Sequence, residues 1–344
     1  SLSNEDDWIP SSSSSCSMKL SLSLLRKKYP SLFHDHNTVA TSWLDIPIDQ
    51  REMQIFTRQS KERMIYVGQA EVVHVSGEDS ADVLVSDRAT TCHLLVLQSR
   101  NGSSMAHVDG PCYQSCINDM IARHGQQQLH MKDDDDDDDE IIHVHIMGGF
   151  PNDKASLEIS HFLLQTLSLA AAAASSRTRL QLDTCIVSDW NDDGHGGPMG
   201  RGLGFNLHTK EVFMAKVCDP GPAMELRSAR LWCGSEESRR LSVVASSCGN
   251  VITIEPFAIS LQENIPSLLS LPNDILLQCC STSPEMEDAE EFCRELRDTF
   301  FFLLVFSRRE SKPVFASPTT PRRYKRIGNS NEWKLMKTND NSTV

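Results

Sequence analysis

The sequence predicts an α+β protein built on a mixed or antiparallel β-sheet core that is sandwich-like and flanked by helices. Short strand-like segments follow one another along the chain, turn residues separate them, and few helices stand between consecutive strands. A parallel βαβ fold would alternate strands with helices, so this order favours the α+β class. The chain has 344 residues, of which 39% are apolar and 23% charged, and this composition suits a large globular core.

The strand segments are rich in β-branched and apolar residues and are bounded by turn residues. They are expected at 64–75, 81–86, 90–98, 103–109, 141–150, 179–188 and, as two hairpins, in 202–217 and in 239–246 with 250–258. The clearest turn is Asn101-Gly102, a pair typical of tight β-hairpins. Residues 90–98 and 103–109 are therefore expected to be antiparallel neighbours.

Helical spacing of apolar residues predicts helices at 111–124, 153–173, 222–232 and 284–306. In the second of these, Ile159, Leu163 and Leu167 lie in one apolar stripe, and Asn152 or Asp153 is the candidate N-cap. The last helix is expected to start with Pro284 at the favoured first position, followed by acidic residues in its early turns.

The chain is expected to form one folded domain with two unstructured additions. Residues 1–40 are predicted to be a Ser-rich, largely disordered N-terminal extension, with ordered structure beginning near residues 18–25. Residues 41–340 form the single domain, which carries an acidic loop insertion at 132–140. The repeated aspartates lack the interleaved glycine and terminal glutamate of a calcium loop, so a solvated loop is the preferred interpretation.

The charge and the cysteine content limit which class of protein this sequence can belong to. The formal net charge is −14, which argues against binding to nucleic acid, and the short basic cluster Arg322, Arg323, Lys325 and Arg326 is interpreted as a solvated tail. No apolar run is long enough to span a membrane, and the first residues are acidic where a leader would be basic. The eleven cysteines show no disulfide spacing. We expect a monomer with free thiols in the cytosol or nucleus.

Cys92 stands where a polar, turn-like lead-in becomes an apolar strand, in the stretch "VSDRATTCHLLVL" at 85–97. Two interpretations are open: a small buried hydrophobe, which is the common fate of an intracellular cysteine, or a reactive thiol. A nucleophilic cysteine needs a neighbouring base, usually histidine, and a group that fixes the imidazole. His93 is adjacent in sequence, but strand alternation directs it to the opposite face together with Thr91. We therefore interpret His93 as structural.

His107 is the better partner, because the predicted hairpin brings it beside Cys92 on the same face. Asp109 shares that face by the same period of two and is a candidate to orient the imidazole or to accept a positive charge. Ser86, in the lead-in, is a candidate donor of a hydrogen bond into the site. From these residues alone, a catalytic Cys–His pair and a packed core cysteine both remain open.

Metal binding would use the same types of residue. His143 and His145 share a strand face, and Cys112 and Cys116 share a helix face, which makes a loose set of zinc ligands. None of these spacings is that of a zinc finger or ribbon. Histidines packed in the core and hydrogen-bonded there are the preferred interpretation, and we expect no metal.

Seven stretches, in order along residues 60 to 336, resemble the protein N-terminal asparagine amidohydrolase family: "YVGQ", "SDRATTCHLLVL", "AHVDG", "HVHIMGGFPND", "GPAMELRSAR", "STSP" and "EWKLM". The most specific part is "ATTCH" followed by "HVDG". The resemblance implies that Cys92 is the nucleophile. It also implies a fold similar to bacterial Cys–His deamidases that act on chemotaxis receptors and Rho proteins. In those enzymes a histidine on the following strand matches His107, and a hydroxyl residue six positions before the cysteine matches Ser86.

The activity implied by the resemblance is conversion of an N-terminal asparagine to aspartate, with release of ammonia through a thioester on the cysteine. In the family's pathway, the new N-terminal aspartate leads to arginylation and degradation. Recognition of a free ammonium calls for a carboxylate, for which Asp109 is the candidate, and Thr91 is a second candidate for substrate binding. No cofactor is expected, and the partners are proteins or peptides with N-terminal Asn.

The sequence departs from the family at Arg88, where an acidic residue is common, in the longer Ser-rich start and in the aspartate run. Two rival functions are kept open. One is a Cys–His deamidase that acts on internal glutamine and shares only the nucleophile. The other is a non-catalytic metal-binding or interaction module with structural cysteines, in which the acidic run recruits a basic partner.

Overall fold

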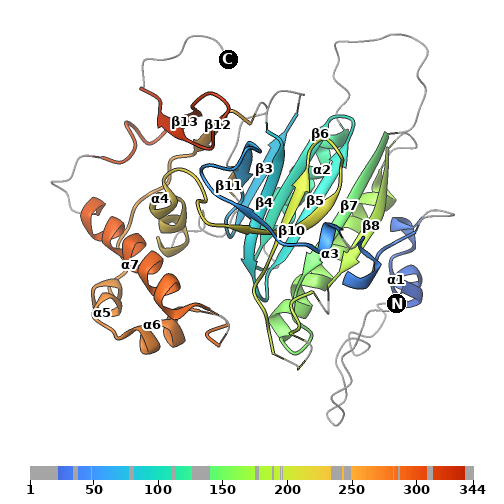
Figure 1. Cartoon of the computed structure of the whole chain (residues 1–344), viewed down its shortest axis with the longest axis horizontal. Coiled ribbons are helices and arrows are strands. Elements are labelled where there is room, and N and C mark those ends of the chain that lie inside the picture. Colours follow the sequence, from blue (N-terminus) through green and yellow to red (C-terminus); the bar gives the residue numbers. More distant parts are fainter. Residues whose placement is uncertain are drawn as a thin grey trace.

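The structure is a computed structural model that describes residues 22–33, 38–47, 49–76, 81–110, 113–125, 140–174, 178–187, 190–193, 195, 197–233, 242–243, 249–281, 283–285, 287–307 and 313–337. Two β-sheets lie face to face, helices cover the outer face of one sheet, and a helical region with a small third sheet follows at the C-terminal end (Figure 1). The predicted α+β class is confirmed.

The larger sheet has six strands in the order β11-β3-β6-β5-β7-β8. Its strands are β3 (Glu71–Val75), β5 (His93–Ser99), β6 (Gly102–Val108), β7 (Glu140–Gly148), β8 (Thr178–Ile186) and β11 (Ser242–Val243). The four central strands β3, β6, β5 and β7 pair antiparallel, whereas β8 and β11 add parallel edges. The predicted hairpin is present, but Ser99 pairs with Gly102. The turn therefore consists of Arg100 and Asn101, one residue earlier than expected.

The second sheet has five strands in the order β1-β10-β9-β4-β2. Its strands are β1 (Gln54–Phe56), β2 (Met64–Tyr66), β4 (Val83–Ala89), β9 (Arg201–Asn206) and β10 (Val212–Val217). The central pairs β4–β9 and β9–β10 are antiparallel, and β1 and β2 join as parallel edges. The hairpin predicted for 202–217 is confirmed as β9 and β10. Both sheets are thus mixed.

The space between the two sheets is filled by apolar side chains from their inner faces. This layer includes buried residues of both sheets, among them Leu84, Leu94, Val96, Met105, Leu203 and Phe205. Alternating residues along each strand supply this layer, as expected for stacked sheets. The catalytic candidates described below lie at one end of it.

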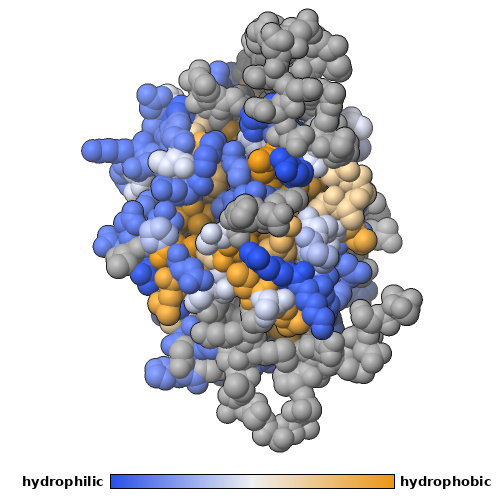
Figure 2. Space-filling view, turned by 90° about the vertical axis from the view of Figure 1, so that its right-hand side faces the viewer, coloured by the Kyte–Doolittle hydropathy of each residue, from blue (hydrophilic) through white to orange (hydrophobic). Residues whose placement is uncertain are grey.

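Helices α1 (Leu22–Lys28), α2 (Gln114–Gly125) and α3 (Lys154–Ala173) cover the outer face of the six-stranded sheet. Asp153 caps α3 by accepting a hydrogen bond from the Ser156 N–H at 2.6 Å, as one of the two candidate caps predicted. On the side where β8 and α1 lie, apolar surface appears between hydrophilic patches (Figure 2).

The predicted N-terminal extension needs correction. Leu25, Tyr29 and Leu32 are buried against the helices and the sheet, so residues 22–33 belong to the folded domain. Residues 1–21 and 132–139 lie outside the described residues, and Glu140, assigned to the loop insertion, is the first residue of β7. In the chain as described, no helix is long and apolar enough to cross a membrane.

The C-terminal region packs helices α4 (Met224–Ala229), α5 (Ile265–Leu269), α6 (Asn273–Cys280) and α7 (Ala289–Phe306) around their own apolar core. Beside them lies a three-stranded antiparallel sheet of β12 (Val251–Ile254), β13 (Arg322–Arg326) and β14 (Trp333–Leu335). Helix α7 starts later than predicted, because Asp288 is the N-cap and accepts a hydrogen bond from the Glu291 N–H. Short 3-10 turns occupy Pro30–Leu32, Trp43–Asp45, Asp49–Arg51 and Arg230–Trp232.

Two strand predictions were wrong. Residues 64–75 are not one strand, because a turn at 67–70 divides them into β2 and β3, which lie in different sheets. At this turn the Glu71 side chain accepts a hydrogen bond from the Gly68 N–H at 2.7 Å, and Ala70 adopts a positive φ of 54°. Of the hairpin predicted for 239–246 with 250–258, residues 239–241 and 244–246 lie outside the described residues, and the described strands of the two halves do not pair with each other. Strand β11 pairs with β3, and β12 pairs with β13.

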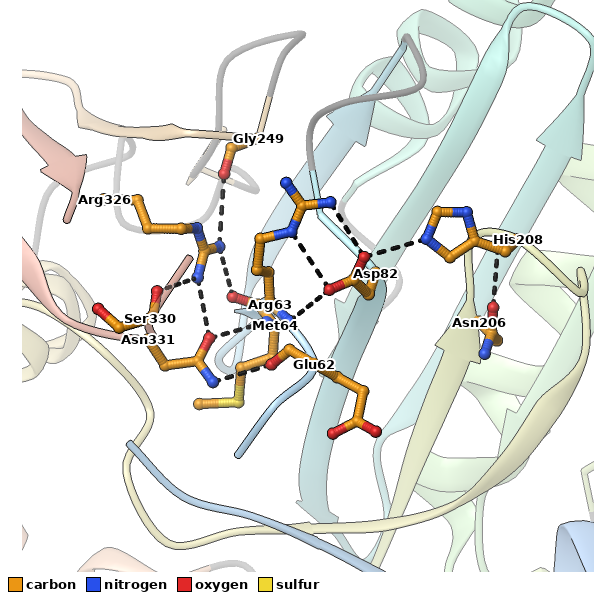
Figure 3. A network of polar contacts seen from close by, with 10 residues as sticks. All are labelled: Glu62, Arg63, Met64, Asp82, Asn206, His208, Gly249, Arg326, Ser330 and Asn331. Atoms are coloured by element: carbon orange, nitrogen blue, oxygen red, sulfur yellow. Dashed lines mark hydrogen bonds and ion pairs between the residues drawn. The ribbon is translucent and has the colours of Figure 1, made fainter. Parts of the chain in front are cut away.

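The basic cluster at 322–326 is also not a solvated tail, because it forms β13. Arg326 points inward and donates hydrogen bonds to the Met64 carbonyl at 2.7 Å and to the Asn331 side chain at 2.9 Å (Figure 3). The guanidinium also lies 4.3 Å from the centre of the Trp333 ring. The Asn331 oxygen in turn accepts a hydrogen bond from the Met64 N–H at 2.9 Å. These contacts tie the small sheet to the outer edge strand β2.

A buried histidine network lies under α2, away from Cys92. The His124 ring contacts the Ser99 hydroxyl through Nδ1 at 2.9 Å and the Ser104 hydroxyl through Nε2 at 2.8 Å. The Ser104 hydroxyl also lies 2.7 Å from His74 Nδ1. Burial lowers the pKa of His124 to about 3 and that of His74 to about 4. Both rings are therefore neutral in the folded protein at neutral pH.

This network predicts that acid destabilises the fold. In the unfolded chain the pKa of His124 returns to its ordinary value of about 6.5, so its stabilising contribution is complete above that pH and is lost as the pH falls toward 3. We expect His124→Asn to lower the free energy of unfolding at pH 7. The substitution should also make the free energy of unfolding less dependent on pH. Between pH 6.5 and 4, its slope against pH should fall by up to about 1.4 kcal/mol per pH unit. Urea unfolding at three pH values measures the slope. His195→Asn, at an exposed site, is the control, and an unchanged slope for His124→Asn would contradict the prediction.

Candidate functional site

Cys92 lies immediately before β5, at one end of the space between the sheets. Its carbonyl accepts a hydrogen bond from the Gly149 N–H at 3.0 Å, which fixes the start of the strand. The end of β7 approaches Cys92 closely. A Cβ added to Gly148 would lie 2.4 Å from the Cys92 carbonyl oxygen, and Gly148 has a φ of +138°. Only glycine fits at this position, which explains why β7 ends in Gly148.

His107 lies on β6 and shares the inner face of the six-stranded sheet with Cys92. The register pairs Leu94 with His107, so the position of Cys92, two residues earlier on the same face, is the diagonal neighbour of His107. His107 is only 4% exposed. The structure therefore brings together the two residues that the sequence predicted, on the predicted face. His93 points to the opposite face, where its Nε2 lies 2.7 Å from the Ser160 hydroxyl.

Ser86 reaches His107 from the other sheet. The Ser86 hydroxyl donates a hydrogen bond to the Val67 carbonyl at 2.6 Å and lies 2.9 Å from His107 Nδ1. A hydroxyl has one proton, so once it is given to Val67 the oxygen can only accept from His107. Nδ1 therefore carries the ring proton, and Nε2 is left with its lone pair. Ser86 sets the tautomer in which His107 can act as a base at Nε2.

The resting site is electrically neutral at its reactive atoms. Burial lowers the pKa of His107 to about 4, although Asp109 and Glu71 oppose this shift. Burial also raises the pKa of the Cys92 thiol, and the carboxylates of Asp109, Glu287 and Asp153 raise it further. Within the described residues His107 Nε2 has no hydrogen-bond partner. In the resting site Cys92 is a thiol and His107 is a neutral imidazole. The thiol proton is therefore transferred to His107 only when the substrate is bound.

Asp109, the candidate for binding a substrate ammonium, follows β6 and is held in place by two neutral donors. The Gln69 amide donates to Oδ2 at 2.9 Å and the Tyr113 hydroxyl to Oδ1 at 2.5 Å. Its carboxylate is half-buried and acts electrostatically on the Cys92 thiol. Thr91, the other candidate, is half-buried beside Cys92.

A cavity of about 180 Å³ lies next to the segment that leads to Cys92. Its walls come from β4, the β4–β5 segment, strands β9 and β10 and the start of α7, and they include Asp87, Arg88, Thr90, Lys216, Glu291 and Phe292. Arg88 has a φ of 57° and forms ion pairs with Glu291 at 2.8 Å and Glu295 at 2.6 Å. Arg88 thus joins the strand of Ser86 to helix α7 at the edge of the cavity.

The zinc interpretation is not supported by the geometry. His143 contacts Asp183 at 2.7 Å and His145 contacts Thr184 at 3.0 Å, and the His145 ring lies against Phe205 between the sheets. Cys116 packs instead in the core under α2, on the other face of the sheet. Cys112 lies outside the described residues. Among the residues that are described, no group of three possible ligands is assembled.

Several residues of the site were missed from the sequence. The Val67 carbonyl supports Ser86, Gln69 supports Asp109, and Glu287 contributes to the field at the thiol. A backbone carbonyl leaves no mark in a sequence, and Glu287 is far from Cys92 along the chain. The stretch "YVGQ" at 66–69 was a signal for the first two, because it is one of the segments that resemble the family.

Comparison with known proteins agrees with this arrangement. Residues 54–335 match the family described as protein N-terminal asparagine amidohydrolase, and this range includes every residue of the site. The chain belongs to this family. It is 28% identical over 247 residues to the protein N-terminal asparagine amidohydrolase of Sus scrofa, covering 70% of this chain and 74% of the relative. The protein of the same name from Homo sapiens is 27% identical over 254 residues, again covering 70% and 74%. That from Mus musculus is 26% identical over 255 residues, covering 72% and 77%.

Membership in the N-terminal asparagine amidohydrolase family makes the protein a hydrolase of the carboxamide of N-terminal asparagine. The resemblance seen in the sequence is confirmed.

The neutral resting site makes a prediction about thiol reactivity. Because burial and nearby carboxylates raise the pKa of Cys92, its alkylation by iodoacetamide should be slower at pH 7 than that of the exposed Cys218 and Cys279. The rate at Cys92 should still be rising above pH 9. Mass spectrometry of the labelled peptides measures each rate separately. A rate that levels off below pH 7 would instead indicate a preformed thiolate–imidazolium pair and would contradict the prediction.

Proposed function

We propose that the protein converts an N-terminal asparagine of proteins or peptides to aspartate through a thioester on Cys92, with His107 as the general base. The observation that carries this proposal is the hydrogen-bond chain from the Val67 carbonyl through Ser86 to His107 Nδ1. It leaves Nε2 free on the face that Cys92 shares. A packed structural cysteine would need no such base.

The reaction proceeds in two stages. Nε2 of His107 takes the thiol proton of Cys92 as Sγ attacks the carboxamide carbon, and the C–N bond then breaks while the imidazolium gives its proton to the departing ammonia. In the second stage His107 takes a proton from water, whose oxygen attacks the thioester carbon. The C–S bond breaks, the thiol is reformed with the proton returned by His107, and aspartate leaves. Every step uses groups of the chain and water.

Selection of the N-terminus follows from charge. An N-terminal asparagine carries an ammonium group two bonds from its side-chain Cβ, whereas an internal asparagine has a neutral amide there. Asp109, held by Gln69 and Tyr113 next to Cys92, offers the ammonium a fixed carboxylate. Thr91 is a further contact of the substrate. Discrimination against glutamine then depends on reach, because one methylene in a pocket is worth only about 1–3 kcal/mol by itself.

The biological role proposed for this activity is the first step of an N-degron pathway. The N-terminal aspartate that the enzyme makes is a substrate for arginylation, after which the protein is degraded. Such substrates are proteins of the cytosol and nucleus, which is where the enzyme would act, as a monomer. The chemistry requires no cofactor.

A panel of peptides tests the substrate. Peptides with N-terminal Asn should release ammonia and gain the mass of deamidation, whereas peptides with N-terminal Gln, N-acetyl-Asn or internal Gln should not. Cys92→Ser should abolish the reaction. Reaction only at internal Gln would show that the substrate assignment is wrong. If no peptide reacts, and the protein binds stoichiometric zinc, it would be an interaction module and not an enzyme.

The ammonium contact makes a separate prediction. We expect Asp109→Asn to raise KM for an N-terminal Asn peptide by about tenfold, which corresponds to about 1.4 kcal/mol for one charged contact in a half-buried site. The change in kcat should be smaller. Steady-state kinetics of ammonia release measure both values, and Asp274→Asn on α6, at an exposed position, is the control. An unchanged KM in Asp109→Asn would exclude Asp109 as the ammonium contact.

A further inference from the structure

We propose that Arg227 and Arg230 of the α4 region are positioning residues for His107, acting through the turn at residues 67–70. The inference rests on the proposed function for its kinetic consequence. Neither arginine belongs to the Cys–His constellation, and both come from a segment more than a hundred residues further along the chain. Both nevertheless form hydrogen bonds at the turn of residues 67–70, which in turn contacts the strand of His107.

Arg227 and Glu71 form an ion pair that is almost completely buried, with side chains 2% and 4% exposed. Arg227 Nε donates to Glu71 Oε1 at 2.8 Å, and a second short contact joins Nη2 to Oε2. The same Nη2 donates to the Tyr66 carbonyl at 3.0 Å. Arg227 therefore forms hydrogen bonds at both ends of the turn, to Tyr66 and to Glu71. The planar guanidinium presents these donors in a fixed geometry.

Arg230 binds the last residue of the same turn. Its Nη2 donates to the Ala70 carbonyl at 2.7 Å, and the Ala70 N–H donates to the His107 carbonyl at 3.0 Å. The backbone of the base is thus tied to α4 through one residue, which is held in a left-handed conformation with a φ of 54°.

The turn also contacts two polar neighbours of the imidazole, Ser86 and Asp109. The Val67 carbonyl accepts the hydrogen bond of the Ser86 hydroxyl, and this fixes the His107 tautomer. The Gln69 amide holds Asp109. A shift of the turn would release the Ser86 hydroxyl and the Asp109 carboxylate together. Misplacement by about 1 Å is enough to cost about a hundredfold in rate when reacting groups must be aligned.

Substitutions at positions 227 and 71 can test the charge of Arg227 separately from its hydrogen-bond geometry. Lysine at this position can pair with Glu71, but its single ammonium cannot reproduce the fork that reaches Glu71 and Tyr66 at once. Glutamine at position 71 can still accept from Gly68 while removing the buried charge. These differences define variants that keep the protein folded.

The test compares three variants in the full-length protein: Arg227→Lys, the double variant Arg227→Met/Glu71→Gln, and Arg326→Met as the matched control. Arg326 is also a buried arginine that binds a β2 backbone carbonyl, but through Met64 and away from the turn (Figure 3). We expect kcat for an N-terminal Asn peptide, corrected for the folded fraction, to fall by about ten- to a hundredfold in both position-227 variants. KM should change less than threefold. Arg326→Met should lower the melting temperature but leave kcat within twofold of the parent.

A second readout does not depend on the substrate. Imidazole 15N chemical shifts report which ring nitrogen of His107 carries the proton. The parent should show the proton on Nδ1, and both position-227 variants should show a mixture of tautomers or exchange between them. Unchanged tautomer signals in both variants would overturn the proposal, even if activity fell. An equal loss of kcat in Arg326→Met would overturn it too, because general loosening would then explain the effect.

These readouts keep the two proposals apart. If no N-terminal Asn peptide reacts but the His107 tautomer changes in the position-227 variants, the positioning role stands and the assigned substrate is wrong. If the peptides react and the tautomer is unaffected, the function stands and the positioning role is wrong.

Discussion

The Glu71 carboxylate is almost entirely removed from water, and the arrangement of the molecule around the site depends on what neutralises it. Its charge is met by Arg227 and by the Gly68 N–H, so one side chain joins the turn between the sheets to the C-terminal helices. Removing one partner of such a pair typically costs about 3–5 kcal/mol, because the other charge remains buried. Each charge therefore requires the other, whereas replacing both side chains together is compatible with the fold.

The site is assembled from both layers of the sandwich. The six-stranded sheet supplies Cys92 and His107, and the five-stranded sheet supplies Ser86 from β4. Ser86 can meet His107 only because the chain crosses from one sheet to the other at residues 67–70 and leaves the Val67 carbonyl between them. The bulge in β4 between Ser86 and Ala89 then turns the chain toward Cys92. The stacking distance of the sheets is thus set, near the site, by hydrogen bonds as well as by apolar packing.

The parts of this arrangement that follow from local pattern could be predicted. Alternation along β5 placed Cys92 and His93 on opposite faces, the hairpin turn placed His107 beside Cys92, and Asp153 was a recognisable helix cap. Long-range pairing could not be predicted in the same way. Residues 64–75 look like one strand because every residue but those at the turn suits a sheet, and the break depends on Arg227 and Glu71, which are distant in sequence. Likewise Arg326 is buried only because Trp333 and Asn331 fold over it.

Strand β7 has its two ends in different settings. Gly148 lies next to Cys92, whereas Glu140, eight residues earlier, is about 26 Å away at a rise of about 3.3 Å per residue. Gly125, where α2 ends, lies near Thr178 beside that distant end. Gly125 and Glu140 therefore both lie at the end of the sheet opposite the thiol. An affinity tag or fluorophore inserted directly after Gly125 or before Glu140 would therefore enter the chain at the end of the sheet that is far from the thiol.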